Sequence, residues 1–304
     1  MTEALYLEVS QKAEAAKTAG RLVSVSGMLQ ILGVSRSGYH SWLHRLPSDS
    51  EVRREKVKEQ IQKIYAKSHQ NYGAPKITKE LQKSGEVISE RTVGTYMRQI
   101  GIRAQWVKPW VATTRDSDFS ESLQNILQEQ FNPNRPNAVW CSDITYIWTM
   151  NGFVYLTSIM DLYSRKIIAW TLSERLDVSC VVDTITKAKN RRKLDQPLLI
   201  HSDRGSQYVA AEYRKATKKM QRSYSKKAYP WDNACIESFH ALIKREWLNR
   251  FQIHDFQQAY RLVFEYIEAF YNTVRIHSHC RYLSPDEFER LYKASGVKQA
   301  LLAS

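Results

Sequence analysis

Three acidic residues, each inside a short and distinctive segment, are the side chains of this chain best suited to chemistry. Asp143 lies in residues 140–146, Asp203 in 201–206 and Glu237 in 232–239. Three carboxylates buried at one point would repel one another and bind protons unless a cation compensated them. Hard divalent cations prefer oxygen ligands, and the sequence has no His/Cys set at zinc spacing. The pattern predicts a site for two Mg²⁺ ions, with Mn²⁺ as a substitute, of the kind used in phosphoryl transfer.

Each acid also has an ordinary structural interpretation when it is taken alone. Asp143 would then cap a strand end, Asp203 would begin a turn before Gly205, and Glu237 would be a solvated helix residue. Only the three together, with their flanking residues, indicate a shared site.

Several neighbours of these acids are candidates for supporting roles. His240 and Lys244 follow Glu237 at helical spacing, so Lys244 either holds a phosphate or is a solvated lysine. We expect a structural turn role for Asp161, and we expect Asp232 and Asn233 to cap the helix that carries Glu237.

The charge of the chain points to a polyanionic partner. The 304 residues carry a formal net charge of +14 with a pI near 9.5, and nucleic acid is the commonest partner of such proteins. Residues 187–227 hold 13 Lys/Arg against 3 Asp/Glu, a net of +10 that surrounds Asp203. A solvated face is the alternative explanation of this run.

Other classes of protein are disfavoured. No apolar run reaches the roughly 18 residues of a membrane span, and the N-terminus lacks the pattern of a signal peptide. The four cysteines are widely spaced, which indicates buried thiols and not a disulfide framework. We therefore expect no membrane partner and a cytoplasmic protein.

The N-terminal third predicts two helix-turn-helix units. We expect the first unit in residues 1–48, a connecting helix in 49–68 and a second unit in 69–104, with Ser35 and Ser89 as helix caps. Ordinary helical hairpins would give the same pattern, but the basic residues of these units favour DNA contact. The candidate DNA contacts here are Arg36, Tyr39, Arg91 and Arg98.

The remainder of the chain changes from a linker to an α/β pattern. Residues 105–137 lack periodicity and contain three prolines, so we expect a linker there, in which Trp106 and Trp110 either stack on bases or pack on the next domain. Residues 138–250 predict three strands, the first two joined at Asn151-Gly152, followed by alternating helices and strands. This order indicates a mixed five-stranded sheet flanked by helices, and residues 251–304 form a helical tail.

Four strings make a family resemblance specific: WCSDITYI, MDLYSRKIIAW, HSDRGSQY and DNACIESFHALIKRE. They resemble, in order, the catalytic core of the insertion-sequence transposases of the IS3 family, within the DDE transposase and retroviral integrase superfamily. The upstream strings ILGVSRSGYHSWLHR and YGAPKITKELQKSG and the tail FYNTVRIHSHCRYLSPDEFE are similar to that family as well.

The resemblance implies a multidomain protein with an RNase H-like catalytic domain and with Asp143, Asp203 and Glu237 as its metal-binding triad. It also implies cleavage of double-stranded DNA at the terminal inverted repeats of an element and transfer of the 3′-hydroxyl to another phosphodiester, in target DNA at integration. The partners it implies are at least a second copy of the chain on DNA and an upstream-frame protein. We expect further DNA contacts from Lys226, Lys227, Lys244 and Arg275.

Two rival functions remain open on the residues. A structure-directed nuclease of the same fold would cut without joining, although helix-turn-helix units imply fixed sites. A non-catalytic DNA-binding regulator would use the basic surface alone and would tolerate loss of Asp143.

Overall fold

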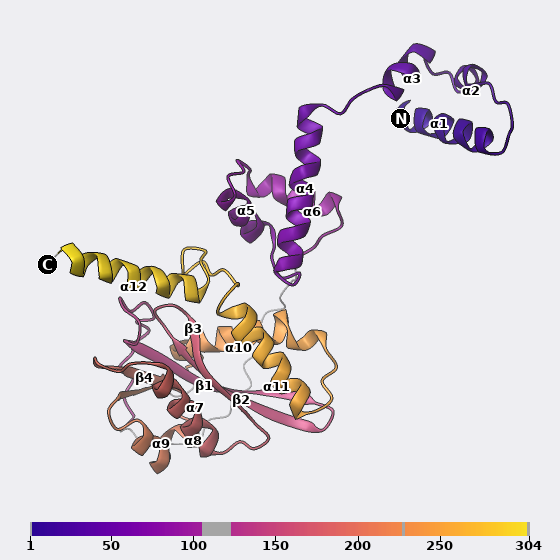
Figure 1. The fold of residues 1–304 in the computed structure, drawn as a ribbon. Helices are drawn as coiled ribbons and strands as arrows, with labels where there is room; N and C mark the ends of the chain where they lie inside the picture. Colours follow the sequence, from indigo (N-terminus) through magenta and orange to yellow (C-terminus); the bar gives the residue numbers. More distant parts are fainter. Residues whose placement is uncertain (1, 105–122, 227–228, 303–304) are drawn as a thin grey trace. The chain divides into compact units, whose positions relative to one another are not determined.

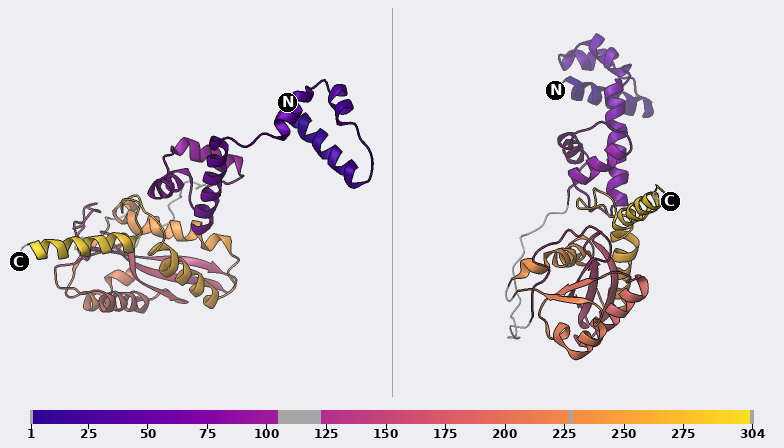
Figure 2. Two further views of the ribbon diagram at one scale, coloured as in Figure 1. Left: turned by 45° about the horizontal axis from the view of Figure 1, so that its top comes forward. Right: turned by 90° about the vertical axis from the view of Figure 1, so that its left-hand side faces the viewer.

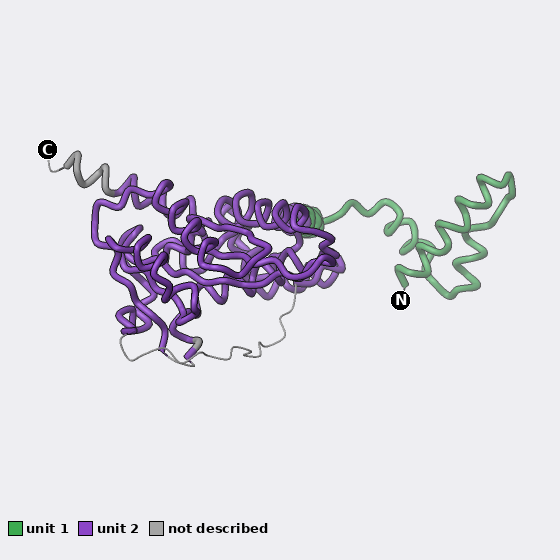
Figure 3. Tube along the Cα trace, turned by 90° about the horizontal axis from the view of Figure 1, so that it is seen from below, with its two compact units in different colours: residues 1–60 green, residues 61–304 purple. Residues whose placement is uncertain are grey.

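The computed structural model describes residues 2–104, 123–226 and 229–302. The chain divides into two compact units, Met1–Gln60 and Ile61–Ser304, which Figure 3 shows in separate colours. The boundary falls inside helix α4 (Asp49–Lys67).

The first unit has a small core formed by the three helices that precede α4. These are α1 (Thr2–Thr18), α2 (Val25–Ile31) and α3 (Arg36–Leu43). The Ser35 hydroxyl accepts a hydrogen bond from the N–H of Gly38 at 3.2 Å, so α3 begins with the predicted cap. The core consists of Tyr6, Val9, Leu29 and Tyr39, and α1 supplies two of these residues.

A second helical pair follows α4. Helix α5 (Ala74–Lys83) ends before Gly85, whose φ of +92° suits glycine, and α6 (Glu90–Gln99) begins at Ser89. The Ser89 hydroxyl accepts from the N–H of Thr92 at 3.2 Å, which confirms the predicted cap. Ile77, Leu81, Val93 and Met97 are buried in this pair.

A five-stranded mixed sheet forms the centre of the second unit. Its strand order is β3-β2-β1-β4-β5 (Figure 1). Strands β1 (Val139–Thr149), β2 (Gly152–Asp161) and β3 (Lys166–Ser173) are antiparallel, whereas β4 (Leu199–Ser202) and β5 (Gln221–Tyr224) run parallel to β1. Gly152 has a φ of +113° at the predicted Asn-Gly turn between β1 and β2. The predicted sheet is confirmed.

Two layers of helices cover the sheet (Figure 2). One core, which includes Trp140, Ile159 and Ile200, packs against α7 (Val178–Arg191) and α9 (Ala211–Ala216). The other core contains residues of α10 (Ala234–Glu246), α11 (Phe256–Phe264) and the π-helical η3 (Glu265–Tyr271). The sequence favours one helix from about Ala210 to Met220, and the structure has the shorter α9 there, separated by the extended Ala210 from the single turn α8 (Ser206–Val209).

The described part of the predicted linker belongs to the sheet domain. Residues 105–122, with Trp106 and Trp110, lie outside the described residues. After them, the Ser223 hydroxyl on β5 accepts hydrogen bonds from the N–H groups of Ile126 and Leu127, at 2.9 and 3.0 Å. Leu127 is buried in the core that contains residues of α10, α11 and η3. A linker running as far as residue 137 is therefore too long.

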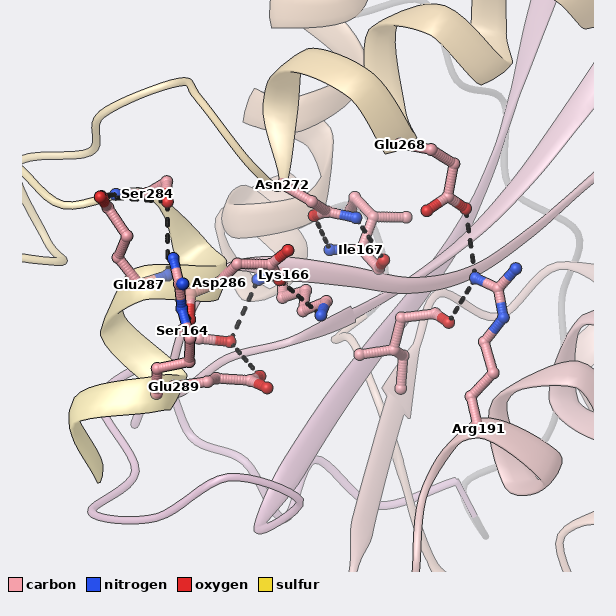
Figure 4. Close-up of polar contacts among 12 residues, drawn as sticks. Ser164, Lys166, Ile167, Arg191, Glu268, Asn272, Ser284, Asp286, Glu287 and Glu289 are labelled. Atoms are coloured by element: carbon pink, nitrogen blue, oxygen red, sulfur yellow. Dashed lines mark hydrogen bonds and ion pairs between the residues drawn. The ribbon is translucent and has the colours of Figure 1, made fainter. Parts of the chain in front are cut away.

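The C-terminal segment is likewise tied to the sheet (Figure 4). Asn272 accepts from the N–H of Ile167 and donates to its carbonyl oxygen, both at 3.0 Å. Helix α12 (Pro285–Leu302) contributes Glu289, which accepts from the Ser164 hydroxyl at 2.7 Å. Asn272 and Glu289 thus attach the segment after residue 251 to the sheet domain.

Candidate active site

Two of the three acids lie where neighbouring parallel strands separate. Asp143 is on β1, and the register pairs Ser142 with Ser202, the last residue of β4. Asp203 follows immediately, so both acids lie next to the same pair of strand positions, as the sequence predicted. The N–H of Gly205 donates to Oδ1 of Asp203 at 2.9 Å. A Cβ atom on residue 205 would lie 3.0 Å from that oxygen, so glycine keeps the space beside the carboxylate open.

The third acid reaches the same region from helix α10. Glu237 is half-buried in the first turn of this helix, after the 3₁₀ turn η1 (Pro230–Asn233). Burial, together with the negative charges of Asp143 and Asp203, raises the pKa of Glu237 to about 7. The charges of the two aspartates therefore act on Glu237.

His240 fixes the orientation of Asp143. Its Nδ1 lies 3.2 Å from Oδ2 of Asp143, and its Nε2 lies 3.3 Å from the Ser158 hydroxyl. Since a carboxylate only accepts, Nδ1 carries the proton toward Asp143, and in the neutral ring Nε2 accepts from Ser158. Ser158 is also the register partner of Asp143 on β2, so strand pairing and α10 hold the same carboxylate.

The structure corrects the expected capping roles of Asp232 and Asn233. Asn233 stands at the N-cap position of α10 but makes no capping hydrogen bond with its side chain. Its Nδ2 instead donates to the carbonyl oxygen of Ser142 at 3.4 Å, and Asp232 accepts from the N–H of Lys226 at 2.7 Å. Both residues are buried and connect the start of α10 to β1 and to the chain after β5.

Asp161 has the expected turn geometry. It is buried and accepts from the N–H groups of Tyr163, at 3.0 Å, and Asn137, at 2.8 Å. Burial raises the pKa of Asp161 to about 6, although these hydrogen bonds oppose the shift.

Four of the candidate DNA contacts are exposed: Arg36, Arg91, Arg98 and Lys226. Lys244 is half-buried, with Nζ 4.3 Å from the centre of the Tyr146 ring. Burial lowers the pKa of Lys244, whereas the charge of Asp143 opposes that effect. Lys227 lies outside the described residues.

Two candidate DNA contacts are placed otherwise by the structure. Tyr39 is buried against Tyr6, with ring centres 5.7 Å apart. Arg275 is buried, and its Nε and one terminal nitrogen donate to the two carboxylate oxygens of Glu246, both at 2.7 Å. Neither side chain is available to contact DNA. The Tyr39 side chain is buried against Tyr6, and the Arg275 guanidinium is bound to Glu246.

Sequence reasoning missed Tyr208 and Ser158. The Tyr208 hydroxyl lies 2.9 Å from that of Ser142, next to Asp143, and Tyr208 is fully buried. Burial, followed by the charges of Asp143 and Asp203, holds the pKa of Tyr208 well above its ordinary value. The string HSDRGSQY contains this tyrosine, but only the fold shows that it turns back beneath β1.

The three carboxylates lie farther apart than ligands of a single metal ion. Within the described ranges, no three His, Cys, Asp or Glu side chains lie close enough together to hold one ion. None of the helices in the described part of the chain has the length and apolar character that crossing a bilayer requires.

Family models match three segments of the chain. Residues 52–110 match an HTH-like domain, and residues 133–230 and 218–285 match two models that are each described as an integrase core domain. An HTH-like region before an integrase core domain is the arrangement of DNA transposases related to integrases.

Curated relatives identify the family within that class. The chain is 35% identical over 250 residues to the transposase for insertion sequence element IS904 of Lactococcus lactis, covering 82% of this chain and 99% of the relative. It is 34% identical over 270 residues to transposase InsF for insertion sequence IS3A of Escherichia coli, covering 88% and 94%. The chain belongs to the IS3 family of insertion-sequence transposases, and it is a transposase of the polynucleotidyl transferase type.

Two solved structures are similar at low identity. One is the intasome of simian T-cell lymphotropic virus in complex with PP2A regulatory subunit B56 gamma, with a TM-score of 0.43, 15% identity and coverage of 75% of this chain and 74% of that chain. The other is the HTLV-2 integrase catalytic core domain in complex with magnesium, with a TM-score of 0.40, 15% identity and coverage of 51% and 98%.

Proposed function

We propose that this transposase cleaves and joins DNA strands with Asp143, Asp203 and Glu237 as the ligands of two Mg²⁺ ions, for which Mn²⁺ can substitute. The observation that carries the proposal is the placement of three carboxylates from β1, the residue after β4 and the first turn of α10 in one region, where the charges of Asp143 and Asp203 add to burial in raising the pKa of Glu237. A bound divalent cation would reverse that penalty, because it favours the ionised carboxylates.

The chemistry of the donor set fits this ion. All three groups are carboxylates, and hard cations such as Mg²⁺ prefer oxygen ligands. The spacing in the structure is wider than direct ligation by all three requires, so metal binding would draw the side chains together. Glu237 is half-buried and able to turn toward the two aspartates, whereas His240 already holds Asp143.

The chain's residues would position two successive displacements at phosphorus. In the first, water attacks the scissile phosphodiester at the element end and the 3′-oxygen leaves, taking up a proton. In the second, that 3′-hydroxyl loses its proton and attacks another phosphodiester, and one bond forms as one breaks. Lys244 would hold a phosphate oxygen beside Asp143. The bound metal supplies activation of the attacking oxygen and stabilisation of the leaving oxygen.

The two helix-turn-helix units would read the terminal repeats. We assign this role to residues 1–48 and 69–104, where Arg36, Arg91 and Arg98 are exposed on the last helix of each unit, α3 or α6. Lys226 and Lys227 follow β5 and would hold the strand near the carboxylates. Joining two DNA ends needs two such chains, so we propose a multimer on DNA, with an upstream-frame protein as a further partner.

The test uses labelled duplexes that carry the ends of the chain's own element, with Mg²⁺ or EDTA, resolved on a denaturing gel. We expect Mg²⁺-dependent cleavage together with longer joined strands, both lost in Asp203→Asn. The exposed Asp183→Asn on α7 is the matched control and should retain both products.

The alternative functions give different products. Cleavage without joined strands would identify a nuclease. Salt-sensitive binding without a new product, unchanged in Asp203→Asn, would identify a regulator and contradict the proposal.

A further inference from the structure

An exposed set of aromatic rings lies on the hairpin that carries Asp143. Tyr146 and Trp148 on β1 and Phe153 on β2 are 54%, 63% and 48% exposed. The register pairs Trp148 with Phe153, and ring centres lie 4.8 Å apart for that pair and 5.3 Å apart for Tyr146 and Phe153. We call these three residues the aromatic surface.

The geometry of the aromatic surface leaves ring faces open. The interplanar angles are 79° for Tyr146 with Phe153 and 72° for Trp148 with Phe153, so the rings meet edge to face. An edge-to-face pair does not use both faces of either ring. Solvated rings of this size are unfavourable on a free surface, which indicates a ligand with flat apolar faces.

The aromatic surface is continuous with the carboxylates. A pocket of about 170 Å³ lies between Tyr146 and Asp203, and Tyr155, Leu176, Gln207 and Tyr208 complete most of its wall. This volume equals roughly five or six water molecules in the liquid. Such a pocket suits one flat ring and has a carboxylate at one side.

Strand β1 extends past the short strand β4. β4 pairs with β1 only from Val139 to Ser142, so the next residues of β1 have no parallel partner. Side chains from opposite faces meet there: Lys244 on α10 places its ammonium over the Tyr146 ring at 4.3 Å. A cation beside a stacking ring matches a nucleotide, which joins a flat base to an anionic phosphate.

We propose that Tyr146, Phe153 and Trp148 stack unpaired bases of the DNA substrate next to the scissile phosphate. This inference rests on the proposed function, since it assigns the carboxylates to DNA cleavage. The predicted ligand is a DNA end whose last bases have separated, with one base in the pocket beside Asp203 and its neighbours on the aromatic surface.

Binding without metal tests this inference independently of cleavage. The probes are a fully paired duplex end and the same end with a three-nucleotide single-stranded tail that carries 2-aminopurine, both in EDTA. For Trp148→Ala we expect the Kd of the tailed DNA to rise about tenfold, because the variant loses the stacking of one base on an aromatic ring. The Kd of the paired end should stay within about twofold. We expect the unaltered protein to quench the fluorescence of 2-aminopurine in the tail and Trp148→Ala to lose this quenching.

Conservative and distant variants control for folding. Tyr146→Phe should keep the tail preference that Tyr146→Ala loses, and Phe264→Ala, which removes an aromatic ring of similar exposure on α11, should keep it as well. Melting temperatures close to that of the unaltered protein would show that the variants fold.

Two results would overturn the inference. One is an equal effect of Trp148→Ala on tailed and paired DNA, including no effect on either. The other is a shift from dimer to monomer in sedimentation, which would make the aromatic surface an interface between two copies. Because these measurements contain no Mg²⁺, a failure of the cleavage assay would count against the proposed function alone.

Discussion

At the scale of single residues, His240 is the contact that most directly governs the geometry of the carboxylates. It joins Asp143 to Ser158 through its two ring nitrogens. Hydrogen-bond partners of metal ligands usually contribute 10- to 100-fold to metal affinity or activity. We expect His240→Ala to lower strand cleavage by a factor of this order and to raise the Mg²⁺ concentration at half-maximal rate.

The matched control is His254→Ala, an exposed histidine before α11. A Mg²⁺ titration of cleavage distinguishes a positioning role from a merely structural one. An unchanged half-maximal Mg²⁺ concentration in His240→Ala would contradict the proposed role.

Asp161 provides a prediction on pH. Burial raises the pKa of Asp161 to about 6, so the folded protein keeps this proton to a higher pH than the unfolded chain does. A raised carboxyl pKa contributes stability below its ordinary value, and that stability is lost as pH rises through the folded value. The free energy of unfolding of the protein minus that of Asp161→Asn should therefore fall by about 3 kcal/mol between about pH 4 and pH 6. Urea titrations across this range measure it, and a difference that rises with pH would refute the assignment.

The sequence predicted the three acids but not how the nearby groups are used. Asp143 and Asp203 follow from strand patterns, because neighbouring parallel strands about 4.8 Å apart bring a side chain of β1 and one at the end of β4 close together. The partners of Arg275 and Tyr39 could not be predicted. Glu246 lies 29 residues from Arg275, and the Tyr6 that covers Tyr39 belongs to α1, which the pattern did not suggest. Burial of such polar groups is decided by tertiary packing and not by local spacing.

At the scale of elements, the buried pair of Arg275 and Glu246 joins the end of α10 to the segment after η3. Both side chains are 7% exposed. Tyr266 on η3 adds a hydrogen bond to Glu246 at 2.8 Å. Although burial alone would raise the pKa of Glu246, the hydrogen bonds and charge of Arg275 outweigh it and hold that pKa below its ordinary value.

We expect Arg275→Met to destabilise the protein by about 3–5 kcal/mol, because it leaves a buried carboxylate without its cation. Thermal or urea unfolding measures this loss. The variant Arg261→Met is the control, since its partner Glu265 and Arg261 itself are both well exposed. Equal stability of the two variants would show that the buried pair has no special weight.

Element boundaries were harder to predict than element types. The strands and both helix caps follow from alternation and from serine placement, whereas α9 ends at Ala216, before the expected end at Met220, without a glycine or proline to stop it. The attachment of residues 123–137 depends on Ser223, nearly 100 positions away, so composition alone made that stretch look like a linker.

At the scale of the whole molecule, positive charge is unevenly divided. Residues 1–60 contain 9 Lys/Arg and 7 Asp/Glu, a net of +2, which leaves +12 of the total +14 to residues 61–304. Non-specific DNA affinity depends on such charge and on salt, whereas base contacts determine sequence preference. Residues 1–60 should therefore contribute more to the sequence preference of DNA binding than to its general affinity.

Salt titration of DNA binding by the intact protein tests whether single basic residues contact phosphates. Arg91→Gln and Arg98→Gln should each lower the slope of log K against log salt by about 1 if they contact phosphates. Lys12→Gln on α1, whose ammonium is paired with Glu8 at 2.9 Å, should leave the slope unchanged. An equal decrease for all three would indicate a diffuse field in place of defined contacts.

The register of the β1–β2 hairpin has a consequence for how this protein can evolve. Asp143 opposite Ser158 and Trp148 opposite Phe153 belong to one ladder, on opposite faces of one strand. Inserting a single residue between Asp143 and Trp148 would turn every later side chain to the other face. Descendants of this chain can therefore lengthen the hairpin between these residues only in steps of two residues per strand, or at the Asn151-Gly152 turn. The acid and the aromatic surface are inherited as one piece.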